Sequence, residues 1–112
     1  MTPALIGIAL IVVAFFLLTR VGKTSPEEAR KLVASGAKLV DVRSPSEFAS
    51  GHIQGAVNIP LSELGRRRGE LSKEGKPVVL YCHSGARSGQ GARVLKQAGL
   101  TAVYDLGAMS RW

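Results

Sequence analysis

Residues 77–88 read PVVLYCHSGARS and contain a change from an apolar strand pattern to a helical one. The first half, Pro77 to Cys82, is the most apolar run after the N-terminal segment and predicts a buried central strand. The second half opens a helix predicted over 86–98, which Gly99 should end. In α/β sheets the turn from a strand into a helix gathers reactive groups at the carboxyl end of the strand. Cys82 lies at such a turn, so the sequence predicts the functional site there.

The same alternation of strand and helix patterns surrounds this stretch. Further helices are predicted over 25–35, 44–51 and 61–71, and further strands over 38–43, 56–60 and 102–106. Two of the helices open with a capping box that has proline at the first helical position, SPEE at 25–28 and SPSE at 44–47. Strands that alternate with helices predict an α/β fold around a mainly parallel sheet.

The loop after the central strand combines three features that suit a sulfur nucleophile. Cys82 meets the start of a helix, where unpaired backbone N–H groups favour negative charge and therefore a thiolate. Gly85 permits a tight curl that turns successive N–H groups inward as an anion nest. Arg87 adds a positive charge with a planar donor fork. A lone cysteine at a strand end can also be a small core residue, but these neighbours favour a reactive cysteine that attacks an anionic substrate.

The chain resembles the rhodanese family from about Ser25 to Trp112. The motifs that carry the resemblance are DVR at 41–43, EF at 47–48, GHIQGA at 51–56, NIP at 58–60, CHSGARS at 82–88 and LGAMSRW at 106–112. The resemblance implies a rhodanese-like three-layer domain with a mainly parallel, five-stranded sheet. It also implies a sulfurtransferase that carries a persulfide on Cys82.

A rhodanese-type reaction would move sulfane sulfur from a small anionic donor, such as thiosulfate or a persulfide, to a thiol or cyanide acceptor. Cys82 is the predicted catalytic residue. The backbone N–H groups of the loop and the Arg87 side chain are predicted to hold the substrate, and Asp41 and Arg43 are candidates for bracing the pocket from the same sheet edge. No metal or organic cofactor is expected. The predicted substrate-binding residues are His83, Ser84, Gly85, Ala86 and Arg87.

Two alternative functions remain open from the sequence. Four residues separate Cys82 from Arg87; this spacing is that of rhodanese-like sulfurtransferases, whereas the related thiol phosphatases and arsenate reductases have a loop one residue longer. The shorter loop disfavours phosphate or arsenate chemistry. The other alternative is a non-catalytic, membrane-tethered rhodanese-like module that presents its surface to a partner, and the sequence identifies no protein partner.

The N-terminal segment has a different composition from the rest. Fifteen of residues 1–19 are apolar and none has a charged side chain. This pattern predicts a transmembrane anchor over 1–19, a short linker over 20–24 and the rhodanese-like domain over 25–112. Arg20 and Lys23 follow the apolar run and no basic residue precedes it, so the positive-inside tendency predicts a single-pass protein of the cell membrane with its C-terminal domain in the cytoplasm.

Composition excludes several other classes. The chain has 112 residues, which allows one small domain. Its single cysteine excludes an internal disulfide framework and a multi-cysteine zinc site. The net charge is +7, but the basic residues form only one triplet, Arg66 to Arg68, without interleaved aromatic residues, so no nucleic-acid partner is expected.

Overall fold

The computed structural model describes residues 5–11 and 22–112. Residues 5–11 are helical, and the element order after them alternates helices and strands as the sequence predicted. The elements are α2 (Pro26–Ala34), β1 (Lys38–Asp41), α3 (Pro45–Ala49), β2 (Val57–Asn58), α4 (Leu61–Leu64), α5 (Arg68–Ser72), β3 (Val78–Cys82), α6 (Ala86–Gln97), β4 (Val103–Ala108) and the 3₁₀ helix η1 (Met109–Arg111).

The sheet is entirely parallel, with the strand order β2-β1-β3-β4. The α/β class is therefore confirmed, but among residues 5–11 and 22–112 the sheet has four strands instead of the five expected. A parallel bridge between Lys23 and Asp105 occupies the outer edge of β4, where a fifth strand would pair. On its C-terminal side this bridge is bounded by the capping serine Ser25, two residues after Lys23.

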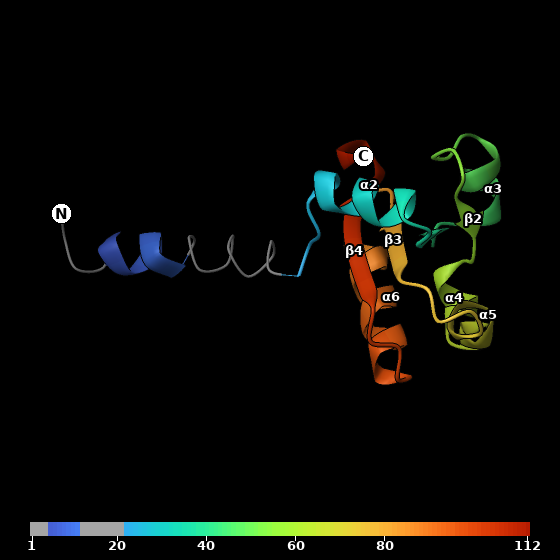
Figure 1. Ribbon diagram of the computed structural model, residues 1–112. Coiled ribbons are helices and arrows are strands. Elements are labelled where there is room, and N and C mark those ends of the chain that lie inside the picture. Colours follow the sequence, from blue (N-terminus) through green and yellow to red (C-terminus); the bar gives the residue numbers. More distant parts are fainter. Residues whose placement is uncertain (1–4, 12–21) are drawn as a thin grey trace.

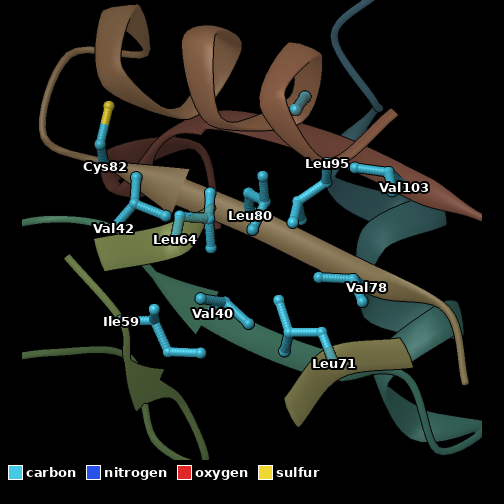
Figure 2. Packing of buried hydrophobic residues seen from close by; sticks show 11 residues of the cluster. Val40, Val42, Ile59, Leu64, Leu71, Val78, Leu80, Cys82, Leu95 and Val103 are labelled. Atoms are coloured by element: carbon cyan, nitrogen blue, oxygen red, sulfur yellow. The ribbon is translucent and has the colours of Figure 1, made fainter. Parts of the chain in front are cut away.

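The helices cover both faces of the sheet (Figure 1). Side chains alternate along β3 because successive residues of a strand point to opposite faces. Val78, Leu80 and Cys82 pack with Leu95 of α6 in one buried cluster (Figure 2). Val79 and Tyr81 belong to a second cluster, which contains Ala29 of α2. All five residues of β3 are buried, as expected for the central strand.

The capping boxes mark helix starts as predicted. The Ser25 hydroxyl accepts a hydrogen bond from Glu28 N at the start of α2, and Ser44 and Glu47 form a complete capping box at the start of α3. The single helix expected over 61–71 is instead divided into α4 and α5. Arg67 leaves the helical conformation with φ −99° and ψ 11°, in a segment whose Gly65 and Gly69 lower the helix propensity.

The predicted membrane segment is not supported. Of the predicted span 1–19, residues 1–4 and 12–19 lie outside the described residues. Within 5–11 and 22–112 no helix has both the length and the apolar character needed to cross a membrane; α6, with 12 residues, is well short of the roughly 20 that a bilayer requires. This finding overturns the prediction of a single-pass protein of the cell membrane with a cytoplasmic domain, and the predicted membrane partner has no support either.

Candidate functional site: the cysteine loop

Cys82 ends the central strand, directly before the loop that leads into α6 (Figure 2). Its side chain is fully buried. Two backbone N–H groups point at its sulfur: Gly85 N lies 3.0 Å and Ser88 N lies 3.3 Å from Sγ. The Ser88 hydroxyl oxygen, 3.6 Å from the same atom, accepts from the Cys82 thiol and is not a third donor. Donors directed at one sulfur atom stabilise negative charge on it, and a thiolate is the nucleophilic form of cysteine.

Gly85 makes this geometry possible. It is the N-cap of α6 and has φ 101°, a left-handed conformation that residues with a Cβ rarely adopt. This turn directs the free N–H groups of the first helical turn back toward the strand end. The Ser88 hydroxyl donates to the Gly85 carbonyl oxygen at 3.2 Å and ties the turn to the helix.

The remaining loop residues face solvent. His83, Ser84 and Ala86 are exposed, whereas Gly85 is buried. The structure thus brings the backbone of the predicted loop together around Sγ, with the side chains of these three residues outside. The sequence analysis missed Ser88, which supplies the second donor. Ser88 is the third residue of α6, and its N–H could have been expected to be free because the first four N–H groups of a helix lack intrahelical acceptors.

Arg87 binds the carboxylate of Glu47, for which the sequence predicted a role in helix capping. Its Nη1 and Nη2 donate to Oε1 and Oε2 of Glu47 at 2.7 and 2.9 Å. Glu47 also accepts from the Ser44 backbone N–H at 3.1 Å. The hydrogen bonds from Arg87, and then those from Ser44, hold the pKa of Glu47 well below its usual range. The same pair raises the pKa of Arg87, with a smaller contribution from the nearby Cys82. The ion pair therefore anchors α6 to the start of α3.

Asp41 and Arg43 form a buried ion pair next to the strand ends. The Asp41 side chain has no exposed surface and that of Arg43 is 7% exposed. Arg43 Nε lies 3.0 Å from both carboxylate oxygens, and Nη2 lies 2.7 Å from Oδ2. Hydrogen bonding to Asp41 raises the pKa of Arg43. Arg43 also donates to the Gly51 carbonyl oxygen at 2.7 Å, so the pair braces the segment after α3.

Tyr81 completes this buried polar cluster and provides a pH-dependent test. Its hydroxyl accepts from Ile53 N at 3.1 Å, and burial raises the pKa of Tyr81 to about 12. An unfolded tyrosine loses its proton near pH ~10. The folded state keeps the proton to higher pH, so this contribution to stability is complete below about pH 10 and is lost as the pH rises toward the folded value. We expect the unfolding free energy of the wild type to fall above about pH 10 more steeply than that of Tyr81→Phe.

Urea unfolding at about pH 8 and about pH 11 measures this difference, and the tyrosinate absorbance difference between the two proteins follows Tyr81 directly. Equal losses of stability in wild type and Tyr81→Phe would contradict the assignment.

The Arg87–Glu47 pair gives a second pH-dependent expectation. Because the pKa of Glu47 is lowered in the folded state, its contribution to stability is present above the unfolded value of about 4.3 and is lost as the pH falls below it. Glu47→Gln should therefore lower the urea midpoint near neutral pH and make less difference at about pH 3. A midpoint difference of the same size at both pH values would show that the lost charge is not the cause.

A three-ligand metal site of the usual residue types does not occur among residues 5–11 and 22–112: no three His, Cys, Asp or Glu side chains lie together in a suitable group.

Comparison with known proteins identifies the architecture around this loop. The rhodanese-like domain family matches residues 25–112, which include every element from α2 to η1. The chain belongs to the rhodanese-like domain family. The uncharacterised protein YqhL of Bacillus subtilis is 46% identical to this chain over 94 residues. The matched region covers 83% of this chain and 74% of YqhL.

Two relatives of the rhodanese-like domain have names that state an activity. Thiosulfate sulfurtransferase GlpE of Pseudomonas aeruginosa is 34% identical over 91 residues, 80% of this chain and 82% of its own length. The structure of the human single-domain sulfurtransferase TSTD1 superposes with a TM-score of 0.64 at 33% identity, over 81% of this chain and 91% of that one. The rhodanese-like domain therefore shares its fold and family with sulfurtransferases.

Proposed function

We propose that this protein is a sulfurtransferase that carries sulfur as a persulfide on Cys82. The observation that carries the proposal is the convergence of the Gly85 and Ser88 N–H groups on the buried Sγ at the start of α6. A preorganised set of donors stabilises negative charge without reorganisation during the reaction. The names of GlpE and TSTD1 add support from the family.

In the first half-reaction the Cys82 thiolate attacks the outer sulfur of thiosulfate. A new S–S bond forms between Sγ and that sulfur, and the S–S bond inside thiosulfate breaks. Sulfite leaves with the electron pair of the broken bond, and the terminal sulfur of the persulfide carries the negative charge. In this proposal the N–H groups of the loop, two of which already face Sγ, hold the negative charge of the persulfide.

In the second half-reaction a thiolate or cyanide attacks the terminal sulfur. The bond between Sγ and that sulfur breaks, the Cys82 thiolate is restored, and the acceptor leaves as a persulfide or as thiocyanate. Because no bond to carbon or phosphorus is cleaved, no water has to be activated. The cycle is a double displacement through a covalent intermediate.

The exposed part of the loop lies between the buried sulfur and solvent. Cys82 has no exposed surface, whereas His83, Ser84 and Ala86 face solvent. We assign these residues, with Gly85 and Arg87, to the entry and binding of the anionic donor. Asp41 and Arg43 do not contact Sγ and act in this proposal as a support for the neighbouring segment.

Intact mass measurement after incubation with thiosulfate tests the proposal. We expect a gain of about 32 Da, the mass of one sulfur atom, on Cys82, and its loss after addition of cyanide with formation of thiocyanate. The assignment is unambiguous because the chain has one cysteine. A folded protein that gains no sulfur from thiosulfate or from small persulfides would contradict the proposal and favour a non-catalytic rhodanese-like module.

A further inference from the structure

Lys23 connects the N-terminal edge of the domain to the cysteine loop. Its Nζ donates to the Gly85 carbonyl oxygen at 2.8 Å and to Oδ2 of Asp105 at 2.6 Å. We propose that Lys23, held by Asp105, is a positioning residue that fixes the Gly85 turn for sulfur transfer. This inference rests on the proposed function, and none of the features that led to Cys82 in the sequence points to Lys23.

The backbone around Lys23 is itself held in place. Lys23 forms the parallel bridge with Asp105, and Thr24 N donates to the Asp105 carbonyl oxygen at 2.7 Å. Arg111 Nη2 donates to the Thr24 carbonyl oxygen at 3.3 Å. The ammonium group therefore extends from a fixed segment toward the loop, and less side-chain freedom is lost in forming its bonds.

The bond to Gly85 acts on the groups that face the sulfur. Gly85 donates its own N–H to Cys82 Sγ at 3.0 Å, while its carbonyl oxygen accepts from Lys23. The C=O and N–H of a planar trans peptide point in opposite directions. Fixing the Gly85 carbonyl on the Lys23 side therefore turns the N–H of Ala86 the other way, to the interior of the turn where negative charge is to be stabilised.

Asp105 keeps Lys23 in this orientation. The Asp105 side chain is 7% exposed and that of Lys23 is 22% exposed. Among the described residues Oδ1 of Asp105 has no hydrogen-bond partner, so the ion pair with Lys23 compensates the buried carboxylate. Nζ of Lys23 donates to the Gly85 carbonyl and to the Asp105 carboxylate at the same time. Movement of the ammonium group breaks at least one of these two bonds, which restrains the Lys23 side chain.

Glycines leave space for the lysine side chain. A Cβ on Gly89 would lie 3.3 Å from Lys23 Nζ and 3.5 Å from Oδ2 of Asp105. A Cβ on Gly107 would lie 3.4 Å from Lys23 Cδ, and Gly107 has φ 91°, which favours glycine. A side chain at Gly89 would press on the Lys23 ammonium group, whereas a Cβ at Gly107 would meet Lys23 in ordinary contact and press on Nη1 of Arg111 at 3.2 Å.

Lys23 also lines two hollows beside the loop. One, of about 500 Å³, is lined by Lys23, Ser84 and Gly85 together with residues of β4 and η1. The other, of about 600 Å³, is lined by Lys23, by Asp105 and by residues along α6 from Ala86 to Lys96. The Gly85 carbonyl oxygen also accepts from the Ser88 hydroxyl and from Gly89 N, both within α6, so Lys23 supplies the hydrogen bond that reaches this carbonyl from outside the helix.

The test uses full-length Lys23→Met and the double variant Lys23→Met/Asp105→Asn. The double variant removes the uncompensated carboxylate, so it remains informative if the single variant does not fold. Lys38→Met is the matched control, because Lys38 also bonds a backbone carbonyl, that of Glu70, at 2.9 Å and also pairs with a carboxylate, that of Glu74. Lys38 begins β1 and lies at the opposite end of the strands from the loop.

We expect roughly tenfold faster amide hydrogen exchange at Gly85 in the folded double variant, with Leu80 in the middle of β3 unchanged. We also expect kcat for thiosulfate to fall roughly tenfold with a smaller change in KM, because the lost restraint affects the charged intermediate more than donor binding. Lys38→Met should leave both the Gly85 exchange and kcat at the wild-type values. A merely structural lysine would lower the melting temperature and move neither readout.

Unchanged Gly85 exchange, or unchanged kcat in the folded double variant, would overturn the positioning role while leaving the proposed function intact. A wild-type protein that accepts no sulfur would refute the proposed function, and Lys23 would then have no reaction to serve. In that case the exchange measurement alone still decides whether Lys23 fixes the turn.

Discussion

Cys82→Ser is expected to lower sulfur transfer from thiosulfate to cyanide by at least about 10³-fold. A serine hydroxyl can accept the N–H groups of Gly85 and Ser88 much as the sulfur does. It is, however, ionised far less readily than a thiol, and it does not form a persulfide. Steady-state thiocyanate formation, measured at saturating thiosulfate, gives the ratio of the two rates.

The melting temperature of Cys82→Ser serves as the control, because it shows whether the variant is folded. Ser is close to Cys in size and has hydrogen-bond partners at this position, so the melting temperature should stay near that of the wild type. Transfer that persists in folded Cys82→Ser would remove Cys82 from the mechanism, whatever the mass measurement shows for the wild type.

The second large effect is expected at the buried ion pair. Arg43→Met leaves the Asp41 carboxylate fully buried and without its charged partner. Breaking a buried pair from one side costs about 3–5 kcal/mol, a large part of the ~5–15 kcal/mol by which domains of this size are stable. We expect a correspondingly lower urea midpoint, or an unfolded protein at room temperature.

Two further variants show whether the unpaired Asp41 charge causes the loss of stability. Arg43→Met/Asp41→Asn removes the isolated charge, so it should be more stable than Arg43→Met alone. Arg66→Met is the exposed counterpart: Arg66 pairs with Glu63 at 2.8 Å but its side chain is 73% exposed, so its loss should barely move the midpoint. A double variant no more stable than Arg43→Met would show that the cost is lost packing instead of an unpaired charge.

Short-range patterns determined the elements of this domain. The capping serines Ser25 and Ser44 place the starts of α2 and α3, because an N-cap satisfies N–H groups only two or three residues away. The apolar run 77–82 and Gly85 place β3, the turn and α6 for the same reason. The α/β class and the location of Cys82 at a strand end were therefore predictable from the sequence.

Two predictions, the fifth strand and the membrane segment, differ from the structure. Within residues 5–11 and 22–112, the position of the expected fifth strand is occupied by a single bridge between Lys23 and Asp105. The expected membrane segment has no counterpart in the described residues. An apolar composition predicts that a segment is able to cross a membrane. The described part of the chain contains no helix that is long and apolar enough for this.

Pairings of side chains across the fold were decided only by the tertiary structure. Arg87, which remains a proposed donor-binding residue, pairs with Glu47, 40 positions away, because the sheet and its helices bring the two together. Lys23 reaches Asp105, 82 positions away, and through the same nitrogen atom the Gly85 turn. Local sequence signals act over one or two turns of chain, whereas these contacts depend on strand order and register, which bring distant residues to one edge of the sheet. The sequence by itself thus determined that Cys82, at the end of the central strand, is the candidate site residue, and the tertiary structure decided which distant side chains contact its loop.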